Sequence, residues 1–196
     1  MSDDPNELIK ISMEVALKPV TDIAESVIGL AGGDWLTEKR KRNRERLRAE
    51  TENILHERKI DRPTEPPPTI AIDLLKGAQD EDRDELVHIW AALLARAMDP
   101  DTRKSYRRQF AEVARSLEPL DAVALSILAA PGRLEPHRAA FVAKQTGATH
   151  DEVSLAIESL RNLGLIQSGP AITATHPGLL PLGRAFLAAV STIARE

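Results

Sequence analysis

Apolar side chains recur three or four residues apart along most of this chain, which is the period of an amphipathic helix. A proline-rich stretch over 61–69 interrupts the pattern and predicts an extended connector. A proline within a helix removes a backbone donor, so a kink is expected at Pro19. In the first half the predicted helices run from Pro5 to that kink and over 20–28, 35–59, 70–77, 82–98 and 102–117.

From Pro119 onward charged residues become fewer and the predicted elements become shorter. Two short strands are predicted around the turn at Gly169-Pro170, at 165–167 and 171–173. The predicted helices are 119–130, 135–146, 150–163 and a last one that carries Leu182, Phe186, Val190 and Ile193.

Three helices, a two-stranded wing and a closing helix are the elements of a winged-helix domain. The expected fold is therefore mainly α. A helical domain is expected over 1–117, followed by a winged-helix-like domain over 118–196.

Local signals mark several predicted helix ends. Asp82 with Glu85, and Thr149 with Glu152, have the spacing of a capping box, in which each residue bonds the backbone amide of the other. Gly164 is suited to end the helix over 150–163, because glycine adopts the left-handed conformation of a helix stop without strain.

The composition limits both the core and the chemistry. Aromatic residues make up 3% of the chain, so aliphatic residues must form the core, and Leu86, Trp90 and Leu93 are predicted to face it. The absence of cysteine excludes disulfides, thiolate zinc sites and cysteine nucleophiles. The start, MSDDPNE, is acidic, and no apolar run of about 18 residues occurs. We therefore expect a cytoplasmic protein with no transmembrane segment.

The main charge feature is a basic run in the predicted helix over 35–59. Seven of the ten residues from Lys39 to Arg48 are basic, although the formal net charge of the chain is −4. A second basic cluster is predicted on one face of the helix over 102–117. Segregated charge creates a local positive potential, which indicates an anionic partner. The candidate binding residues are Lys39, Arg40, Lys41, Arg42, Arg44, Arg103, Lys104, Arg107 and Arg108.

A purely structural explanation of the basic run is equally open. A narrow stripe of Leu36, Asn43, Leu47 and Ile54 would face the domain, after a turn formed by Gly29, Gly32 and Gly33. The cations beside it could support the helix through pairs four residues apart, each worth about 0.2–0.5 kcal/mol. These pairs are Glu38–Arg42, Lys41–Glu45, Arg46–Glu50 and Arg48–Glu52.

No residue pattern predicts a reaction, a cofactor or a metal. None of the five histidines lies four residues from another, as in a helical zinc site. The acidic residues over 80–85 stand at a predicted helix start, where they complement the helix dipole. The glycines over 29–33 lack the Lys-Ser/Thr of a phosphate loop. We therefore expect no catalytic, cofactor-binding or metal-binding residue, and a protein that is not an enzyme.

The predicted recognition helix over 150–163 does not favour DNA binding. It carries Asp151, Glu152 and Glu158 against Arg161 and His150, whereas a helix that enters a groove needs cations. A surface for a protein partner or a second copy is the better interpretation. Nucleic acid and an anionic membrane surface stay open as partners of the basic clusters.

Four stretches together resemble one bacterial family, abortive infection alpha (Abi-alpha). They are GLAGGDWLTEKRKRN (29–43), DELVHIWAALLARAMDP (84–100), SLEPLDAVALSIL (116–128) and LRNLGLI (160–166). The resemblance covers nearly the whole chain in the expected order. It departs at LLPLGRAFL (179–187), where Pro181 stands in place of a hydroxyl cap.

The resemblance implies a role in defence against phage and supplies no catalytic residues. The expected function is a non-enzymatic, cytoplasmic component of abortive infection that acts through macromolecular contacts. The alternative is a nucleic-acid-binding, winged-helix regulator that uses the basic patches.

Overall fold

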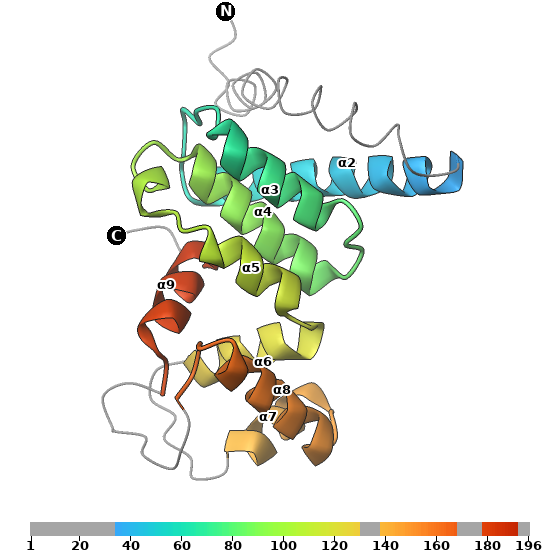
Figure 1. Cartoon of the computed structure of the whole chain (residues 1–196), viewed down its shortest axis with the longest axis vertical. Coiled ribbons are helices and arrows are strands. Elements are labelled where there is room, and N and C mark those ends of the chain that lie inside the picture. The colour runs from blue at the N-terminus through green and yellow to red at the C-terminus, as the bar shows by residue number, and fades with distance from the viewer. Residues whose placement is uncertain (1–33, 130–137, 168–177, 192–196) are drawn as a thin grey trace, which may run out of the picture. The chain divides into compact units, whose positions relative to one another are not determined.

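The computed structural model describes residues 34–129, 138–167 and 178–191 (Figure 1). The helices predicted before residue 29, the glycine turn, the strand at 171–173 and Ile193 lie outside the described residues. Within the described ranges the protein is mainly helical, as expected, with eight α-helices. The chain divides into two compact units, Met1–Arg115 with Ala189–Glu196, and Ser116–Ala188. The assignment of 1–117 and 118–196 as two separate domains stays a prediction.

The first unit is built around one apolar helix. Its elements are α2 (Asp34–Glu57), α3 (Pro68–Ala78), α4 (Asp84–Met98), a 3-10 turn η1 (Arg103–Ser105) and α5 (Gln109–Ser116). Both α2 and α3 pack against α4 and against each other. Helix α4 is buried over most of its length, and the predicted core residues Leu86, Trp90 and Leu93 are confirmed as buried.

A glycine allows α3 to approach α4 closely. A Cβ atom added to Gly77 would lie 2.3 Å from the ring of Trp90. The indole therefore occupies the space that any larger residue at position 77 would need. Arg115 at the end of α5 also lies over this aromatic, with its guanidinium carbon 5.9 Å from the ring centroid.

The predicted inner stripe of α2 is confirmed over most of its length. Leu47 and Ile54 are buried, and so is Asn43, whose amide donates a hydrogen bond to the carbonyl of Gln79 at 3.0 Å. Leu36 is only half-buried. The helix thus turns one narrow face towards its neighbours and leaves its basic flanks for other contacts.

The second unit contains three short helices that pack against one another, followed by a fourth. They are α6 (Pro119–Ala129), α7 (Arg138–Thr146), α8 (His150–Asn162) and α9 (Pro181–Val190), and their ranges are close to those predicted. The last two residues of α9 belong to the first unit. The capping box of Thr149 and Glu152 is confirmed. Gly164 follows the end of α8 by two residues and has a φ of 68°, the left-handed conformation predicted for this helix stop.

A short antiparallel pairing follows α8. Ile166 forms an isolated bridge with Leu179, the amide of Gln167 donates to Gly178 at 2.6 Å, and the amide of Leu180 donates to Leu165 at 2.9 Å. The first predicted strand position is therefore paired, and its partner here is the segment directly before α9. No strand longer than this bridge occurs in the described part of the chain.

Asp121 joins two helices of the second unit. Its buried carboxylate accepts hydrogen bonds from the amide of Glu118 at 3.1 Å, before α6, and from the hydroxyl of Ser159 on α8 at 2.8 Å. We expect Asp121→Ala to lower the free energy of unfolding by about 1–3 kcal/mol, because it removes the acceptor of both hydrogen bonds.

The matched variant Ser159→Ala removes only one of these hydrogen bonds, so a smaller loss of about 0.5–1.5 kcal/mol is expected. Chemical denaturation of the full chain measures both values. Equal stabilities of Asp121→Ala and the parent protein would contradict this role of the carboxylate.

Candidate functional site

The basic start of α2 lies against an acidic segment between α3 and α4. Arg40 forms two hydrogen bonds to Asp80, from Nε to Oδ1 at 2.7 Å and from Nη2 to Oδ2 at 3.0 Å. Lys39 Nζ lies 2.8 Å from Oδ2 of Asp82. The hydrogen bond to Asp80 raises the pKa of Arg40, and the hydrogen bond from Lys39 lowers the pKa of Asp82. Two candidate binding residues are thus used within the fold.

Arg46 continues this contact two turns further along α2. Its Nη1 donates to the carbonyl of Asp82 at 2.8 Å, and its guanidinium also pairs with the carboxylate of Asp84. The acidic segment over 80–84 therefore binds the basic helix, in addition to standing before α4. Its acidic residues were explained from the sequence as helix-start charges, and that explanation was incomplete.

The capping box predicted for Asp82 and Glu85 is wrong. Helix α4 begins at Asp84, and its N-cap residue, Arg83, makes no side-chain cap. Glu81 instead accepts hydrogen bonds from the amides of Asp82 and Arg83, at 3.2 and 3.0 Å. The loop is closed by a carboxylate one residue before the predicted position.

Of the four pairs predicted along α2, only Arg48–Glu52 is present in the part of the chain that the structure describes, with Nε 3.0 Å from Oε1. The predicted pair Arg46–Glu50 is wrong, because Arg46 reaches Asp84 and Glu50 reaches His88. The pairs Glu38–Arg42 and Lys41–Glu45 are also absent from the described residues. For Arg46 and Glu50, partners on α4 replace the local ones.

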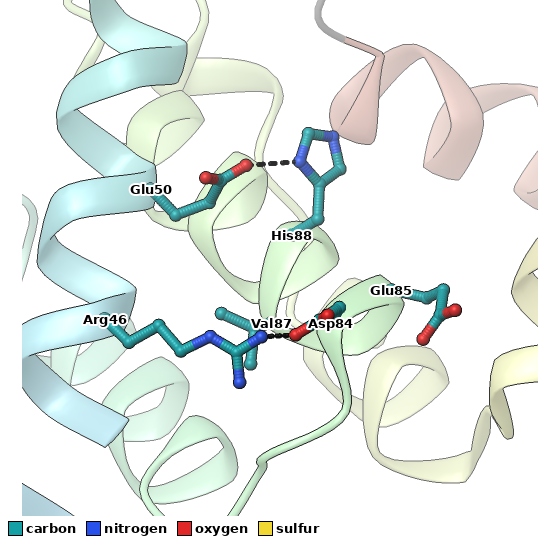
Figure 2. A pocket seen from close by; sticks show the side chains of 6 residues that line it. All are labelled: Arg46, Glu50, Asp84, Glu85, Val87 and His88. Atoms are coloured by element: carbon teal, nitrogen blue, oxygen red, sulfur yellow. Dashed lines mark hydrogen bonds and ion pairs between the residues drawn. The ribbon is translucent and has the colours of Figure 1, made fainter. Parts of the chain in front are cut away.

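A shallow hollow of about 450 Å³ lies between α2 and α4 (Figure 2). Its charged side chains are joined across the two helices. Oε1 of Glu50 lies 2.7 Å from Nδ1 of His88, and Arg46 pairs with Asp84, while Glu85 points away from both pairs. Its lining residues are Arg46, Glu50, Asp84, Glu85, Val87 and His88.

Two candidate residues on α2 keep their charge available. Lys41 and Arg42 are exposed, and no carboxylate of the described residues lies within ion-pair distance of either. Arg44 is half-buried and has interactions of its own. Trp35, seven residues before Arg42, is 71% exposed, and the ammonium of Lys39 lies 5.9 Å from its ring centroid. This end of α2 therefore presents a tryptophan together with two cations that no carboxylate of the described residues neutralises.

The second basic cluster does not lie on one helical face, and that prediction is wrong. Helix α4 stops at Met98, and α5 begins only at Gln109. Asp99 accepts a hydrogen bond from the hydroxyl of Thr102 at 2.7 Å, which favours a turn there. The 3-10 turn η1 then ends at Tyr106, whose backbone is extended.

All four cations of this second cluster are exposed. Within the described residues no carboxylate pairs with any of them, and Arg103 makes only a long hydrogen bond to Thr64 Oγ1 at 3.5 Å. The structure therefore gives the two predicted clusters different roles. The α2 cluster is partly neutralised by its own fold, whereas the second cluster keeps its charge at Arg103, Lys104, Arg107 and Arg108.

Among the described residues, no three histidine, aspartate or glutamate side chains gather in a way that could hold a metal ion. The same residues include no helix that is both long and apolar enough to cross a bilayer.

Comparisons with known proteins show which family this chain belongs to. No curated protein and no solved structure matches this chain. A family model described as abortive infection alpha matches residues 38–180, which include α2 from its basic run onward, the acidic segment and the first three helices of the second unit. This match covers well over half of the 196 residues. The chain therefore belongs to the abortive infection alpha family.

Proposed function

We propose that this protein is a cytoplasmic component of abortive infection in bacteria, and that it acts by contact with another macromolecule rather than by catalysis. The observation that carries the proposal is the family match over residues 38–180, since the family is named for abortive infection. The exposed end of α2 is the proposed contact surface.

The residue types at this end of α2 support a protein partner. Tryptophan and arginine are the residues most enriched among those that dominate protein interfaces. Trp35 is exposed although large apolar residues are otherwise mostly buried in the described chain, and Arg42 stands two turns further along the same helix. We refer to Trp35, Lys41 and Arg42 as the α2 contact surface.

The hollow between α2 and α4 supports a structural role for its charged groups. Arg46 with Asp84, and Glu50 with His88, each join one helix to the other. Groups held in this way link α2 to α4 within the unit. We therefore propose that the protein's action does not depend on a reaction in this hollow.

We further propose that the second unit is winged-helix-like and binds protein rather than DNA. Three mutually packed helices followed by the antiparallel bridge of Ile166 and Leu179 support the first part. For the second part, α8 exposes Asp151, Glu152 and Glu158, which would repel DNA phosphates. This disfavours the alternative of a DNA-reading regulator that inserts α8 into a groove.

A phage-challenge assay in cells tests the α2 contact surface. We expect the charge reversal Lys41→Glu with Arg42→Glu to abolish protection while the melting temperature stays within about 2 °C, because exposed substitutions of this kind change stability little. Survival after infection and thermal melting of the purified protein are the two measurements.

The matched control reverses Arg62 and Lys76, two exposed cations of the first unit outside α2, and produces the same change in net charge. Protection should persist in this control. If both double variants protect as well as the parent protein, the α2 contact surface has no role in defence.

A further inference from the structure

The segment from Arg103 to Arg108 concentrates positive charge on the surface of the described chain. Four of its six residues are basic and exposed, and none is paired with a carboxylate of the described chain. This differs from α2, where Lys39, Arg40 and Arg46 all contact the acidic segment. An unneutralised group of cations in an acidic chain creates a strong local field.

The backbone beneath these cations is held in place. The amides of Ser105 and Tyr106 donate to Thr102 and Arg103 at 2.9 and 3.1 Å. The hydroxyl of Ser105 accepts a hydrogen bond from Arg96 at 2.8 Å. Tyr106 packs edge-on against Phe110, with ring centroids 5.9 Å apart. Arg103 and Lys104 therefore lie in an ordered turn. Arg107 and Arg108 follow directly before α5, where their carbonyls accept hydrogen bonds from the amides of Phe110 and Ala111 at 2.9 and 3.1 Å. A backbone held in this way reduces the entropy lost on binding.

We propose that Arg103, Lys104, Arg107 and Arg108 bind the phosphate backbone of duplex nucleic acid without reading its sequence. This deepens the proposed function, on which it rests, by naming the partner of a second surface. We refer to these four residues as the phosphate-binding segment.

The chemistry of the segment favours a phosphate polymer over the other anionic partners. Three of the four residues are arginines, whose forked donors match phosphate oxygens. The only aromatic of the segment, Tyr106, packs on Phe110, and the large apolar residues that are exposed in the described chain, Trp35 and Leu155, lie elsewhere in the sequence. Insertion into a membrane or stacking on single-stranded bases needs such a side chain, whereas duplex phosphates need only charge.

The test measures binding of a fluorescein-labelled 20-base-pair duplex DNA of arbitrary sequence to the full chain, by anisotropy, between 50 and 200 mM salt. Each neutralised phosphate contributes about −0.9 to the slope of log affinity against log salt. Four contacts therefore predict a slope of about −3 to −4. Over this range the affinity should fall about 100-fold.

Neutralising the segment by Arg103→Gln, Lys104→Gln, Arg107→Gln and Arg108→Gln should weaken binding at 50 mM salt at least tenfold. The matched control changes four other exposed cations, Arg62, Lys76, Lys144 and Arg161, to glutamine and gives the same net charge. Its affinity should stay within about threefold of the parent. The paired variants Arg103→Gln with Lys104→Gln, and Arg107→Gln with Arg108→Gln, should each reduce the slope by about 2.

Several results would overturn the inference. These are no binding by the parent protein at 50 mM salt, equal losses in the segment and control variants, or segment-dependent binding to vesicles with 30% phosphatidylserine in place of the duplex. The reversal of Lys41 and Arg42 should leave duplex binding intact. Protection that depends on those two residues, without duplex binding, would therefore leave the proposed function standing and reject only this inference.

Discussion

Replacing Trp90 by alanine is expected to lower the free energy of unfolding by about 3–5 kcal/mol, the usual range for truncating a buried aromatic residue. Trp90 is 1% exposed at the centre of α4 and is among the largest fully buried side chains of the described residues. Its ring contacts Gly77 of α3 and lies beneath Arg115 at the end of α5. Truncation would therefore loosen three helices at once. Chemical denaturation measures the effect.

The second tryptophan provides a matched control. Trp35 is 71% exposed, so Trp35→Ala removes the same side chain without opening a cavity, and a change within about 1 kcal/mol is expected. Comparable losses at the two positions would contradict the packing described for α4.

Gly77 supplies a second check on the same contact. In the parent protein Gly77→Ala should destabilise, because its Cβ would collide with the Trp90 ring. In the Trp90→Ala background the space is free, and alanine is the better helix former by about 1 kcal/mol. The effect of Gly77→Ala should therefore become neutral or stabilising there, which a double-mutant cycle would detect.

Replacing Gly183 by alanine is expected to lower the free energy of unfolding by about 3 kcal/mol, at the upper end of overpacking effects. A Cβ atom at this position would lie 2.1 Å from the carbonyl oxygen of Leu165. That oxygen cannot withdraw freely, because it accepts the hydrogen bond from the amide of Leu180. The substitution must therefore displace the start of α9 or break the pairing before it.

Hydrogen exchange distinguishes this local cause from a general loss of stability. The amides of Gln167 and Leu180 should exchange faster in Gly183→Ala than in the parent protein. This increase should exceed any increase at amides within α4. The control Gly164→Ala introduces a Cβ that contacts nothing and strains only a left-handed residue, at about 1–2 kcal/mol. Unchanged exchange at Leu180 in Gly183→Ala would show that the backbone tolerates the added atom.

The sequence alone was sufficient to locate most helices of the described chain, because periodicity and end signals are local properties. The capping box of Thr149 and Glu152 and the left-handed Gly164 bound α8 within a residue of the predicted limits. The apolar face of α4 likewise predicted the burial of Leu86, Trp90 and Leu93. These features depend on residues within a few positions of one another, so they need no knowledge of the tertiary fold.

The interactions of the candidate site could not be predicted in the same way. The sequence offered Arg46 a local partner in Glu50, but the fold brings Asp84 to it, and Glu50 pairs with His88 instead. Oppositely charged side chains that are far apart in the chain form a pair when the fold brings them close together. The sequence therefore showed where positive charge is concentrated, and only the tertiary structure decided which cations are neutralised.

Tertiary contacts also explain why the predicted helix over 102–117 is interrupted and why glycine is needed at positions 77 and 183. The spacing of Tyr106 and Phe110 fits a helix, yet the chain turns at Asp99 and Thr102 and uses an extended residue at Tyr106. Gly77 and Gly183 carry no local signal, because the atoms that require them belong to Trp90 and Leu165. Periodicity and capping thus determined the elements of this protein. Contacts between elements, which arise only when the chain is folded, decided which cations pair with a carboxylate. Within the described residues they leave Lys41, Arg42 and the phosphate-binding segment without one.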